Sequence, residues 1–493
     1  MTYKYNKPGL FQAFVPIIFL IIALFINVRI FGDASLDGSN QIILMLSAGI
    51  ASIVALKLGF GWKEIRTGIV KSISSAMSSI IILLLIGSLA GTWLLSGIVP
   101  AMIYYGLMIL NPTIFLFAAC VVCAIVAVAT GSSWTTAATV GIALVGIGTA
   151  LGLNPGMVAG AIISGAYFGD KMSPLSDTTN LAPAMVGTDL FTHIRYMAYT
   201  TVPSITISLI LFLILGFMYG GDAQPMSNDA ILAAIGGAFN INGWLFLVPV
   251  LVVVLIIKKI PAIPSILAGA LLGALFALIF QPEVVHGVSG YEQASWESAY
   301  VGVMMAMYGD ISIVTGNEIV DGLLSSGGMF GMLGTVWLIL SAMIFGGVME
   351  ASGMLKRIAE AVISLVNSTG SLIASTVGTC VFFNITASDQ YLAIVVPGRM
   401  YTDTYADKDL APENLSRTLE DSGTVTSVLV PWNTCGAYHA NVLGVSTFAY
   451  LPFAFFNLIS PFMTIFYAYA GIKIRSLAEA QGNITGEEDF DNP

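Results

Sequence analysis

Long apolar segments recur along the chain, and they limit its possible folds more than any other feature. A helix that crosses a membrane needs about 20 consecutive apolar residues. Only 9% of the 493 residues are charged, whereas a soluble domain carries roughly 25%. The sequence therefore predicts an all-α polytopic membrane protein whose main partner is the lipid bilayer. Spans are expected at residues 10–31, 41–58, 73–99, 197–219, 243–258, 261–280, 331–350 and 444–470.

The first apolar segment is expected to remain in the protein. Lys4 and Lys7 precede it, but no small-residue cleavage site follows residues 11–28, so it resembles a span more than a cleaved signal peptide. The net charge of −10 and the lack of a basic stripe give no sign of a nucleic-acid partner. Much of the acid lies in loops and in a tail at 476–493, notably at Glu487, Glu488, Asp489 and Asp491.

The cysteines and histidines suggest neither a cofactor nor an enzyme. Cysteines in apolar surroundings usually act as small core residues, and three histidines scattered along the chain do not form a metal-binding pattern. We therefore expect no disulfide, metal cluster or cofactor, and no nucleophile motif indicates catalysis. The residues concerned are Cys120, Cys123, Cys380, Cys435, His193, His286 and His439.

Two apolar segments are interrupted by short polar stretches. Segment 111–151 contains Thr-Gly-Ser-Ser-Trp-Thr-Thr at 130–136, and segment 370–398 contains Asn-Ile-Thr-Ala-Ser-Asp-Gln at 384–390. Within a bilayer, such backbone breaks are tolerated only where protein or water covers them. Each segment is therefore expected to be a re-entrant hairpin with its tip at the membrane middle. Two full spans joined by a tight turn are the alternative.

Two further helices carry charged residues where they are expected to unwind. The first, 155–187, should break around 170–178, where Pro174 lies between two aspartates. The second, 411–440, carries Glu420 and Asp421. Charged groups deep in a membrane are costly and mark ion pathways, proton relays or substrate sites. Proline also removes a backbone donor, and we expect this to leave carbonyl groups free to bind a cation.

Charge distribution sets the expected orientation, because cytoplasmic loops are rich in Lys and Arg. If both hairpins are re-entrant, about ten helices cross the membrane and both termini are cytoplasmic. The acidic loop 282–328, which contains no Lys or Arg, then lies outside, and Arg29 is one exception to the rule. The basic clusters that fall inside are 57–71, 193–195, 258–259, 356–357, 399–417 and 473–475.

The order of these segments occurs twice. A span, a broken hairpin, a broken helix and a span follow one another in 73–219 and again in 331–475. The leading span runs outward in one and inward in the other, which is the inverted-repeat design of secondary transporters with sites near the midplane. The remaining predicted units are N-terminal spans with a cytoplasmic connection (1–72), connecting spans with the acidic loop (220–330) and the tail (476–493).

The breaks supply oxygen atoms of the kind that a sodium ion prefers, namely carboxylate, hydroxyl, amide and carbonyl. A carboxylate binds either Na⁺ or a proton, so the two compete, and this competition is sufficient for antiport. Lys171 is a possible counter-charge within the site. The candidate cation- and proton-binding residues are Ser132, Ser133, Asp170, Ser173, Ser176, Asp177 and Thr178 in the first half, and Thr386, Ser388, Asp389, Asp421 and Asn433 in the second.

Several candidates also have a purely structural interpretation. Asp170 can form an internal ion pair with Lys171, and Asp177 or Asp389 can cap a helix. Ser132 and Ser133 can be small packing residues. Glu420 is expected to pair with Arg417, three residues earlier on the same helix. Packing or interfacial roles are the alternatives for Trp134, Trp432 and His439.

Three motifs carry a resemblance to a known family. They are Thr-Gly-Ser-Ser-Trp-Thr-Thr at 130–136, Gly-Asp-Lys-Met-Ser-Pro-Leu-Ser-Asp-Thr-Thr-Asn at 169–180, and Val-Pro-Trp-Asn-Thr-Cys-Gly-Ala-Tyr at 430–438. With them the chain, over about 10–475, resembles the NhaC-type sodium/proton antiporters of the ion-transporter superfamily, which include malate/lactate exchangers. The resemblance implies two inverted repeats and a homodimer. Motif positions match at Asp170, Ser173, Asp177, Thr178, Asp389 and Asp421.

The expected function is exchange of Na⁺ for H⁺ across a bacterial inner membrane. The alternative is Na⁺- and H⁺-coupled exchange of a small carboxylate, of the malate-for-lactate type. An acidic tip at Asp389 would repel an anion and favours the first reading. Lys171 and Arg399 keep the second one open.

Overall fold

The computed structural model describes residues 6–109, 111–219, 228–364 and 366–480. The predicted acidic residues Glu487, Glu488, Asp489 and Asp491 lie outside the described part of the chain. The described residues are almost entirely helical, as predicted. Their one sheet pairs two short antiparallel strands, β1 (Ile311–Ser312) and β2 (Ser325–Ser326).

The N-terminal spans follow the prediction closely. α1 is Leu10–Phe31 and α2 is Ser39–Lys57. α3 is Trp62–Leu95, so the expected cytoplasmic connection is mostly the first turns of a long helix. α4 (Ile98–Ile109) follows it directly.

The first broken hairpin folds back on itself. α5 is Pro112–Thr130, and the return arm consists of α6 (Ser133–Thr136), a π-helical turn at Ala137–Gly141 and α7 (Ile142–Ala150). A Cβ added at Gly148 would lie 3.0 Å from Phe115, so the start of α5 and the end of α7 are neighbours. The predicted broken helix follows as α8 (Pro155–Met172) and α9 (Asp177–Val186), and α10 is Leu190–Tyr219.

The middle of the chain holds shorter helices. α11 is Asn228–Ala238, and a 3-10 turn at Gly243–Phe246 leads into α12 (Leu247–Ile257). α13 is Ala262–Phe280. The acidic loop is not an open coil, because it contains α14 (Pro282–Ser289), α15 (Trp296–Tyr308), the two strands and α16 (Glu318–Leu323).

The last third contains a second hairpin and a second broken helix. α17 (Leu333–Ala351) and α18 (Met354–Ile363) lead to a second hairpin, α19 (Thr369–Thr386) and α20 (Gln390–Asp407). The second broken helix starts as α21 (Pro412–Leu419) and continues through a π-helical turn, Glu420–Thr424, and a 3-10 turn, Ser427–Leu429, to α22 (Thr434–Leu443). α23 (Thr447–Tyr450), a 3-10 turn at Leu451–Phe453 and α24 (Phe455–Ala470) complete it.

Nine helices of the described chain are long and apolar enough to cross a membrane, or up to eleven if two bent pairs each form one span. The prediction of about ten lies between these values. The pairs are bent by 86° between α11 and 243–257 and by 55° between 447–453 and α24. Both arms of the first hairpin, 112–130 and 133–150, are themselves long enough to cross. Re-entrance of the hairpins therefore stays a prediction.

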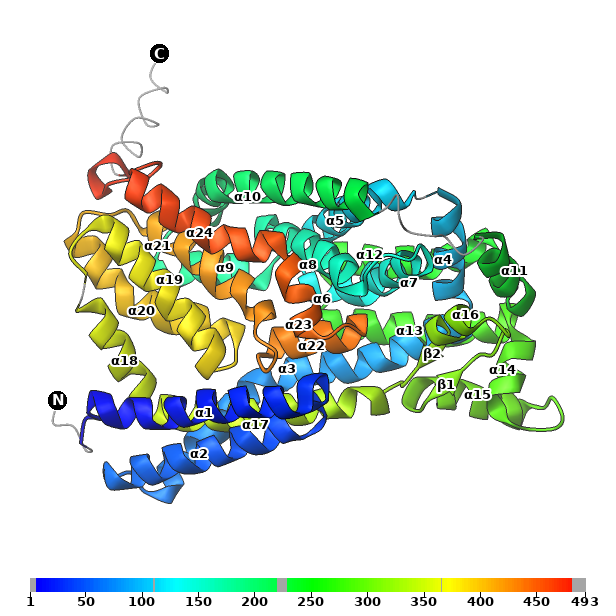
Figure 1. Ribbon diagram of the computed structural model, residues 1–493, viewed down its shortest axis with the longest axis horizontal. Coiled ribbons are helices and arrows are strands. Elements are labelled where there is room, and N and C mark those ends of the chain that lie inside the picture. Colours follow the sequence, from blue (N-terminus) through cyan, green and yellow to red (C-terminus); the bar gives the residue numbers. More distant parts are fainter. Residues whose placement is uncertain (1–5, 110, 220–227, 365, 481–493) are drawn as a thin grey trace, which may run out of the picture.

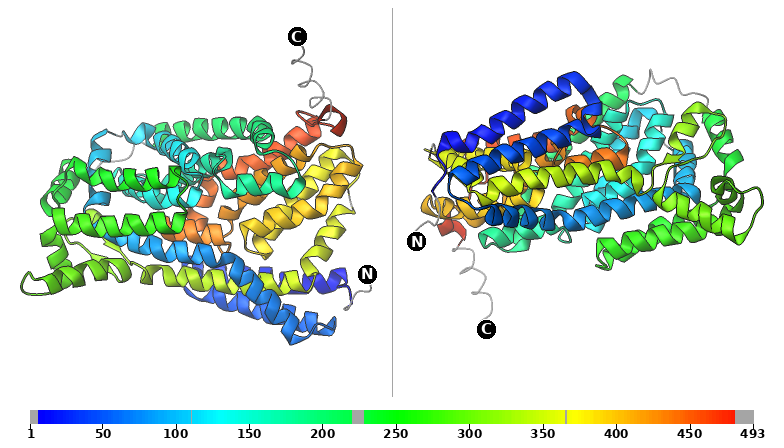
Figure 2. Two further views of the ribbon diagram at one scale, coloured as in Figure 1. Left: turned by 180° about the vertical axis from the view of Figure 1, so that it is seen from behind. Right: turned by 90° about the horizontal axis from the view of Figure 1, so that it is seen from below.

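Most long helices run along the long axis of the molecule (Figure 1). The start of α1 and the end of α24 lie toward one end of it, while α14, α15 and the small sheet lie at the other (Figures 1 and 2). The acidic loop is thus far from both ends of the described chain. α2, α3, α13 and α17 pack together as one group. A second group contains α5, α8, α10, α19 and α24.

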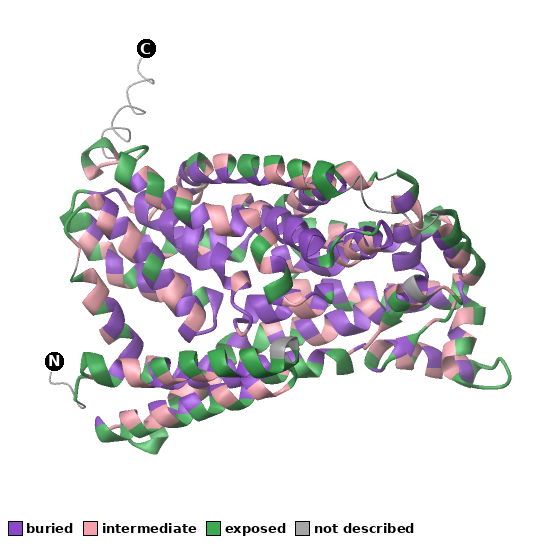
Figure 3. Cartoon of the chain, in the orientation of Figure 1, coloured by how far each residue is buried: buried purple, intermediate pink, exposed green. Residues whose placement is uncertain are grey.

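α5 and α8 pack backbone against backbone. A Cβ on Gly165 would lie 2.0 Å from the carbonyl oxygen of Cys120, and one on Gly169 would lie 2.4 Å from that of Ala124. Only glycine allows this backbone approach. α8 is consequently almost wholly buried, whereas α1, α2 and α10 keep exposed apolar residues along their outer faces (Figure 3).

Candidate functional site

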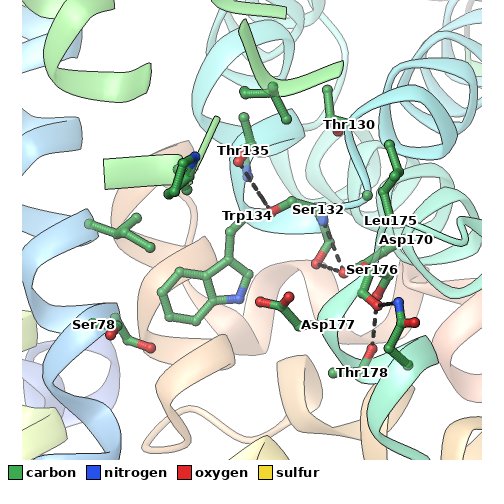
Figure 4. A pocket seen from close by; sticks show the side chains of 18 of the residues that line it. Ser78, Thr130, Ser132, Trp134, Thr135, Asp170, Leu175, Ser176, Asp177 and Thr178 are labelled. Atoms are coloured by element: carbon green, nitrogen blue, oxygen red, sulfur yellow. Dashed lines mark hydrogen bonds between the residues drawn. The ribbon is translucent and has the colours of Figure 1, made fainter. Parts of the chain in front are cut away.

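A cavity of about 760 Å³ lies where the first hairpin tip meets the first broken helix (Figure 4). Its wall is completed by α3, by the turn between α12 and α13, and by the starts of α20 and α22. Half of the lining residues carry a hydroxyl or carboxylate group. Those predicted from the sequence are Ser132, Ser133, Asp170, Ser176, Asp177 and Thr178.

The hairpin tip is shaped by glycine and serine. Gly131 ends α5 in the left-handed conformation, with φ of 70°, which glycine adopts without a Cβ penalty. Ser132 then has extended backbone, and its Oγ accepts a hydrogen bond from the Thr135 backbone N–H at 3.1 Å. Ser132 is therefore the N-cap of the return arm. The polar interruption at 130–136 thus ends one helix and starts the next.

Asp170 and Ser133 join the broken helix to the tip. One Asp170 carboxylate oxygen accepts from the Ser133 backbone N–H at 3.0 Å and from its Oγ–H at 2.7 Å. Both residues are almost completely buried, yet both line the cavity. Ser133 therefore has a specific polar partner, so the alternative in which it is only a small packing residue does not apply. The alternative of an internal ion pair between Asp170 and Lys171 is not formed, because Lys171 binds Asp421.

The break between α8 and α9 occurs at Pro174. The residue before a proline disfavours helical backbone, and Ser173 is extended, with φ of −85° and ψ of 127°. Its Oγ donates to the Val128 carbonyl of α5 at 2.8 Å, away from the cavity lining. Ser176, not Asp177, is the N-cap of α9, so the capping interpretation of Asp177 is wrong.

Asp177 is the first residue of α9, and its side chain is exposed to the cavity (Figure 4). Beside it, the hydroxyl groups of Ser176 and Thr178 lie 3.2 Å apart in a hydrogen bond. Two carbonyl groups of the break accept hydrogen bonds, because the Asn180 amide donates to the carbonyl oxygens of Pro174 at 2.9 Å and Ser176 at 2.6 Å. Side-chain oxygens therefore dominate this part of the wall.

The candidates of the second half stay out of the cavity lining. Asp389 is buried and caps α20, accepting from the Leu392 backbone N–H at 2.9 Å. Thr386 donates to the Phe382 carbonyl, and Asn433 caps α22 while its amide donates to Asn384. Ser388 has a left-handed backbone, with φ of 59°, and its buried Oγ has no hydrogen-bond partner in the part of the chain that the structure describes. From this half, Gln390, Tyr391, Thr434 and Cys435 reach the cavity instead.

Asp421 is fully occupied by other side chains. It forms a completely buried ion pair with Lys171, and one of its oxygens accepts from Ser460 Oγ at 3.2 Å. The other oxygen accepts from Thr200 Oγ1 at 2.8 Å and from Thr464 Oγ1. Because a charge and three hydroxyl groups already satisfy this carboxylate, we leave Asp421 out of the cation site and assign Lys171 as its counter-charge.

Glu420 does not pair with Arg417, contrary to the spacing argument. Among the described residues, neither carboxylate oxygen of Glu420 has a hydrogen-bond partner, and neither do Nε and Nη2 of Arg417. Arg417 instead donates from Nη1 to the Lys473 carbonyl oxygen at 3.1 Å. Its Cζ lies 4.7 Å from the centroid of the Tyr196 ring. Both residues are completely buried.

Sequence reasoning missed two parts of the cavity wall. Ser75, Ser78 and Ser79 of α3 line it, and a run of serines within an apolar span, 72–79, was the available signal. Lys259, which has a left-handed backbone with φ of 63°, also lines it and is the one lysine or arginine among the described lining residues. Its sequence context suggested only a basic turn.

Aromatic contacts connect the first tip to the second half. The Trp134 and Tyr438 rings stack with centroids 3.8 Å apart, and Tyr438 Oη donates to the Trp134 carbonyl at 2.8 Å. His439 is buried behind them, and its Nδ1 lies 2.9 Å from the Cys435 carbonyl. Trp432 donates to the Ile385 carbonyl at 2.8 Å, within the second half. These contacts give each residue a structural partner.

Comparison with known proteins gives consistent results along the chain. The Na⁺/H⁺ antiporter family matches residues 165–472. The Na⁺/H⁺ antiporter NhaC of Alkalihalophilus pseudofirmus is 39% identical, covering 90% of this chain and 93% of the relative. The malate-2H⁺/Na⁺-lactate antiporter of Bacillus subtilis is 38% identical, covering 94% and 95%. The arginine/ornithine antiporter ArcD of Halobacterium salinarum is 36% identical, covering 95% and 93%.

Proposed function

The chain belongs to the Na⁺/H⁺ antiporter family, and we propose that it exchanges Na⁺ for H⁺ across the bacterial inner membrane by alternating access. It is a multi-pass membrane protein, as its many apolar helices indicate. The observation that carries the proposal is the buried Asp170 carboxylate, which faces the cavity while the tip residue Ser133 binds it. A carboxylate kept at such a depth is a costly feature that serves ion binding.

The proposed Na⁺ ligands are the cavity-lining oxygens of Asp170, Asp177, Ser133, Ser176 and Thr178. They combine two carboxylates with three hydroxyl groups, the hard oxygen donors that such cations prefer. Two of these residues lie at the start of α9 and one at the start of α6, so movement of either element changes the ligand set. A proton on either carboxylate removes its attraction for Na⁺, which makes the two ions competitors.

The division of the cavity wall supports alternating access. One side is formed by the tip and the α8–α9 break, and the other by α3 and the α12–α13 turn, which belong to different packing groups. Relative movement of two such groups around a fixed site is the usual way in which inverted-repeat transporters expose it to one side and then the other. The inverted repeat itself, cytoplasmic termini and a homodimer remain parts of this proposal.

The test is Na⁺ efflux from proteoliposomes that contain the purified protein and no organic acid. An imposed pH gradient is expected to drive Na⁺ movement against its concentration, and Asp170→Asn is expected to abolish it. Flux that begins only after malate or lactate is added would refute simple Na⁺/H⁺ exchange. A non-saturable flux that needs no counter-ion would instead identify a channel.

The second candidate is coupled exchange of a small carboxylate. The cavity volume of about 760 Å³ is far larger than one sodium ion requires, since even a water molecule occupies only about 30 Å³ in the liquid. Lys259 also places a positive charge in the cavity wall. Asp389, whose charge argued against an anion, does not line it. Relatives of 36–38% identity are named for malate and lactate and for arginine and ornithine, so membership of the family does not fix the cargo.

A further inference from the structure

Glu420 is a buried acid that the proposed Na⁺ site does not use. It begins the π-helical turn of the second broken helix and has no exposed surface. Neither of its carboxylate oxygens has a hydrogen-bond partner among the described residues. The Thr424 hydroxyl lies near Glu420 and interacts with it, but among the described residues it makes no close hydrogen bond to the carboxylate.

The cations around Glu420 are engaged elsewhere. Lys171 binds Asp421 and also donates to Ser460 Oγ at 3.2 Å. Arg417 makes no ion pair within 4.0 Å in the part of the chain that the structure covers; its guanidinium contacts the Lys473 carbonyl and the Tyr196 ring. The elements packed against this turn also carry two arginines, Arg195 of α10 and Arg399 of α20, but both side chains are exposed. The remaining titratable groups on these elements are acids, tyrosines, Cys380 and His193, and none of them supplies a fixed positive charge.

An ionised carboxylate without hydrogen bonds or a paired cation is very unfavourable in an apolar interior, and such a group takes up a proton instead. Glu420 therefore holds a proton in this conformation. Asp170 differs in kind, because two donors from Ser133 bind one of its oxygens and it opens onto the cavity. Two acids in such different surroundings favour different protonation states, and they can therefore serve as different groups in one mechanism.

We propose that Glu420 carries the proton that is exchanged for Na⁺, at a site distinct from the Na⁺ cavity. This inference rests on the proposed Na⁺/H⁺ exchange and adds to it: besides direct competition at Asp170 and Asp177, Glu420 releases a proton when Na⁺ binds. The charges that act on Glu420 are Lys171, Asp170 and Asp421. Na⁺ bound at Asp170 cancels one of the two negative charges and so favours release of the proton from Glu420. Departure of Na⁺ restores that charge and favours reprotonation.

The test separates ion exchange from proton coupling in reconstituted protein. Glu420→Gln mimics the protonated acid, so Na⁺/Na⁺ exchange at equal pH should continue at a rate within about threefold of the original, whereas exchange driven by a pH gradient should fall at least about tenfold. Na⁺-induced proton release from the purified protein should be lost as well. Glu413→Gln is the matched control, because Glu413 is a buried acid of α21 that pairs with Arg475 at 2.7 Å. Its coupling should be unchanged.

A second measurement does not depend on the folding of the variant. Addition of Na⁺ to the original protein should remove a protonated-carboxyl band from the infrared difference spectrum, and the conservative variant Glu420→Asp should shift that band. Undiminished coupling in Glu420→Gln, or a Na⁺-sensitive band that the Asp variant leaves in place, would overturn the proposal. If the original protein shows no Na⁺ binding at all, the proposed function itself fails, and that outcome is distinct from either of these.

Discussion

Ser133 binds one carboxylate oxygen of Asp170 twice, through its backbone N–H at 3.0 Å and its Oγ–H at 2.7 Å. The two residues are separated by 37 positions in sequence and come from the hairpin tip and the broken helix. The contact therefore forms only if the hairpin tip and the broken helix are correctly placed relative to each other. It holds Asp170, the central acid of the proposed Na⁺ site.

Ser133→Ala should weaken Na⁺ binding without abolishing it. The substitution removes the hydroxyl group and leaves the backbone N–H in place, and a hydrogen bond to a charged group contributes about 1.5–3 kcal/mol. We expect Na⁺ affinity to fall by about one to two orders of magnitude, measured by titration calorimetry. Ser173→Ala is the control, because Ser173 binds a carbonyl group outside the cavity lining. Equal losses in the two variants would contradict a specific role for Ser133.

Asp389→Asn should leave Na⁺/H⁺ exchange close to that of the original protein. Asparagine caps helices about as well as aspartate, and Asp389 uses one oxygen for this purpose while lying outside the cavity lining. Asp389→Ala should lower stability by about 1 kcal/mol through loss of the cap, measured by thermal unfolding in detergent. Loss of exchange in the Asn variant would show that the sequence-based assignment of Asp389 as a ligand was right.

Lys171→Met and Asp421→Asn should each destabilise the protein strongly. Removing one partner of a buried ion pair leaves an uncompensated charge and costs about 3–5 kcal/mol. The double substitution should recover much of this loss, because no buried charge then remains. Unfolding temperatures of all four proteins give the interaction energy. Additive losses would mean that the two charges are stabilised independently.

Lys259→Gln should distinguish the two cargo classes. Lys259 lines the cavity, whereas the adjacent Lys258 does not, so Lys258→Gln is a control with the same change in net charge. We expect the Lys259 variant to lose carboxylate-dependent flux and to keep Na⁺/H⁺ exchange measured without organic acid. Equal carboxylate flux in both variants would remove Lys259 from substrate recognition.

Asp321 should make the acidic loop at 282–328 sensitive to pH. Hydrogen bonds from the Thr315 Oγ1–H at 2.7 Å and the Thr315 backbone N–H at 2.6 Å lower the pKa of this exposed carboxyl group. A lowered pKa stabilises the folded loop above the ordinary aspartate pKa, and this contribution is lost as the pH falls through the lowered value. Hydrogen-exchange protection of the Thr315 amide should decrease over that range. Asp321→Asn should show low protection at every pH.

Sequence reasoning located the helix breaks correctly because their signals are local. Pro174 disfavours helix at Ser173, and Gly131 with Ser132 supplies a turn and a cap. The boundary of α3 was less accurate, since a helix continues beyond the bilayer when its charged residues reach water. The span prediction therefore missed its first turns, from Trp62 onward.

Contacts between residues far apart in the sequence could not be predicted from hydropathy or spacing. Lys171 and Asp421 are 250 positions apart, and no periodicity indicates that they form a pair. Spacing alone favoured Arg417 with Glu420, but the backbone changes to a π-helical turn at Glu420, so regular helix geometry does not apply there. Lys259 and the α3 serines face the cavity because of how separate helices pack, which hydropathy does not encode.

The glycine contact between α5 and α8 has a consequence for ion selection. Gly165 and Gly169 bring backbone against backbone, without flexible side chains between the helices. The tip at the end of α5 and Asp170 near the end of α8 are therefore held at a nearly fixed separation. A rigid cage accepts an ion only if its radius fits, so enlarging the interface with Gly169→Ala should shift preference from Na⁺ toward K⁺ before transport itself is lost.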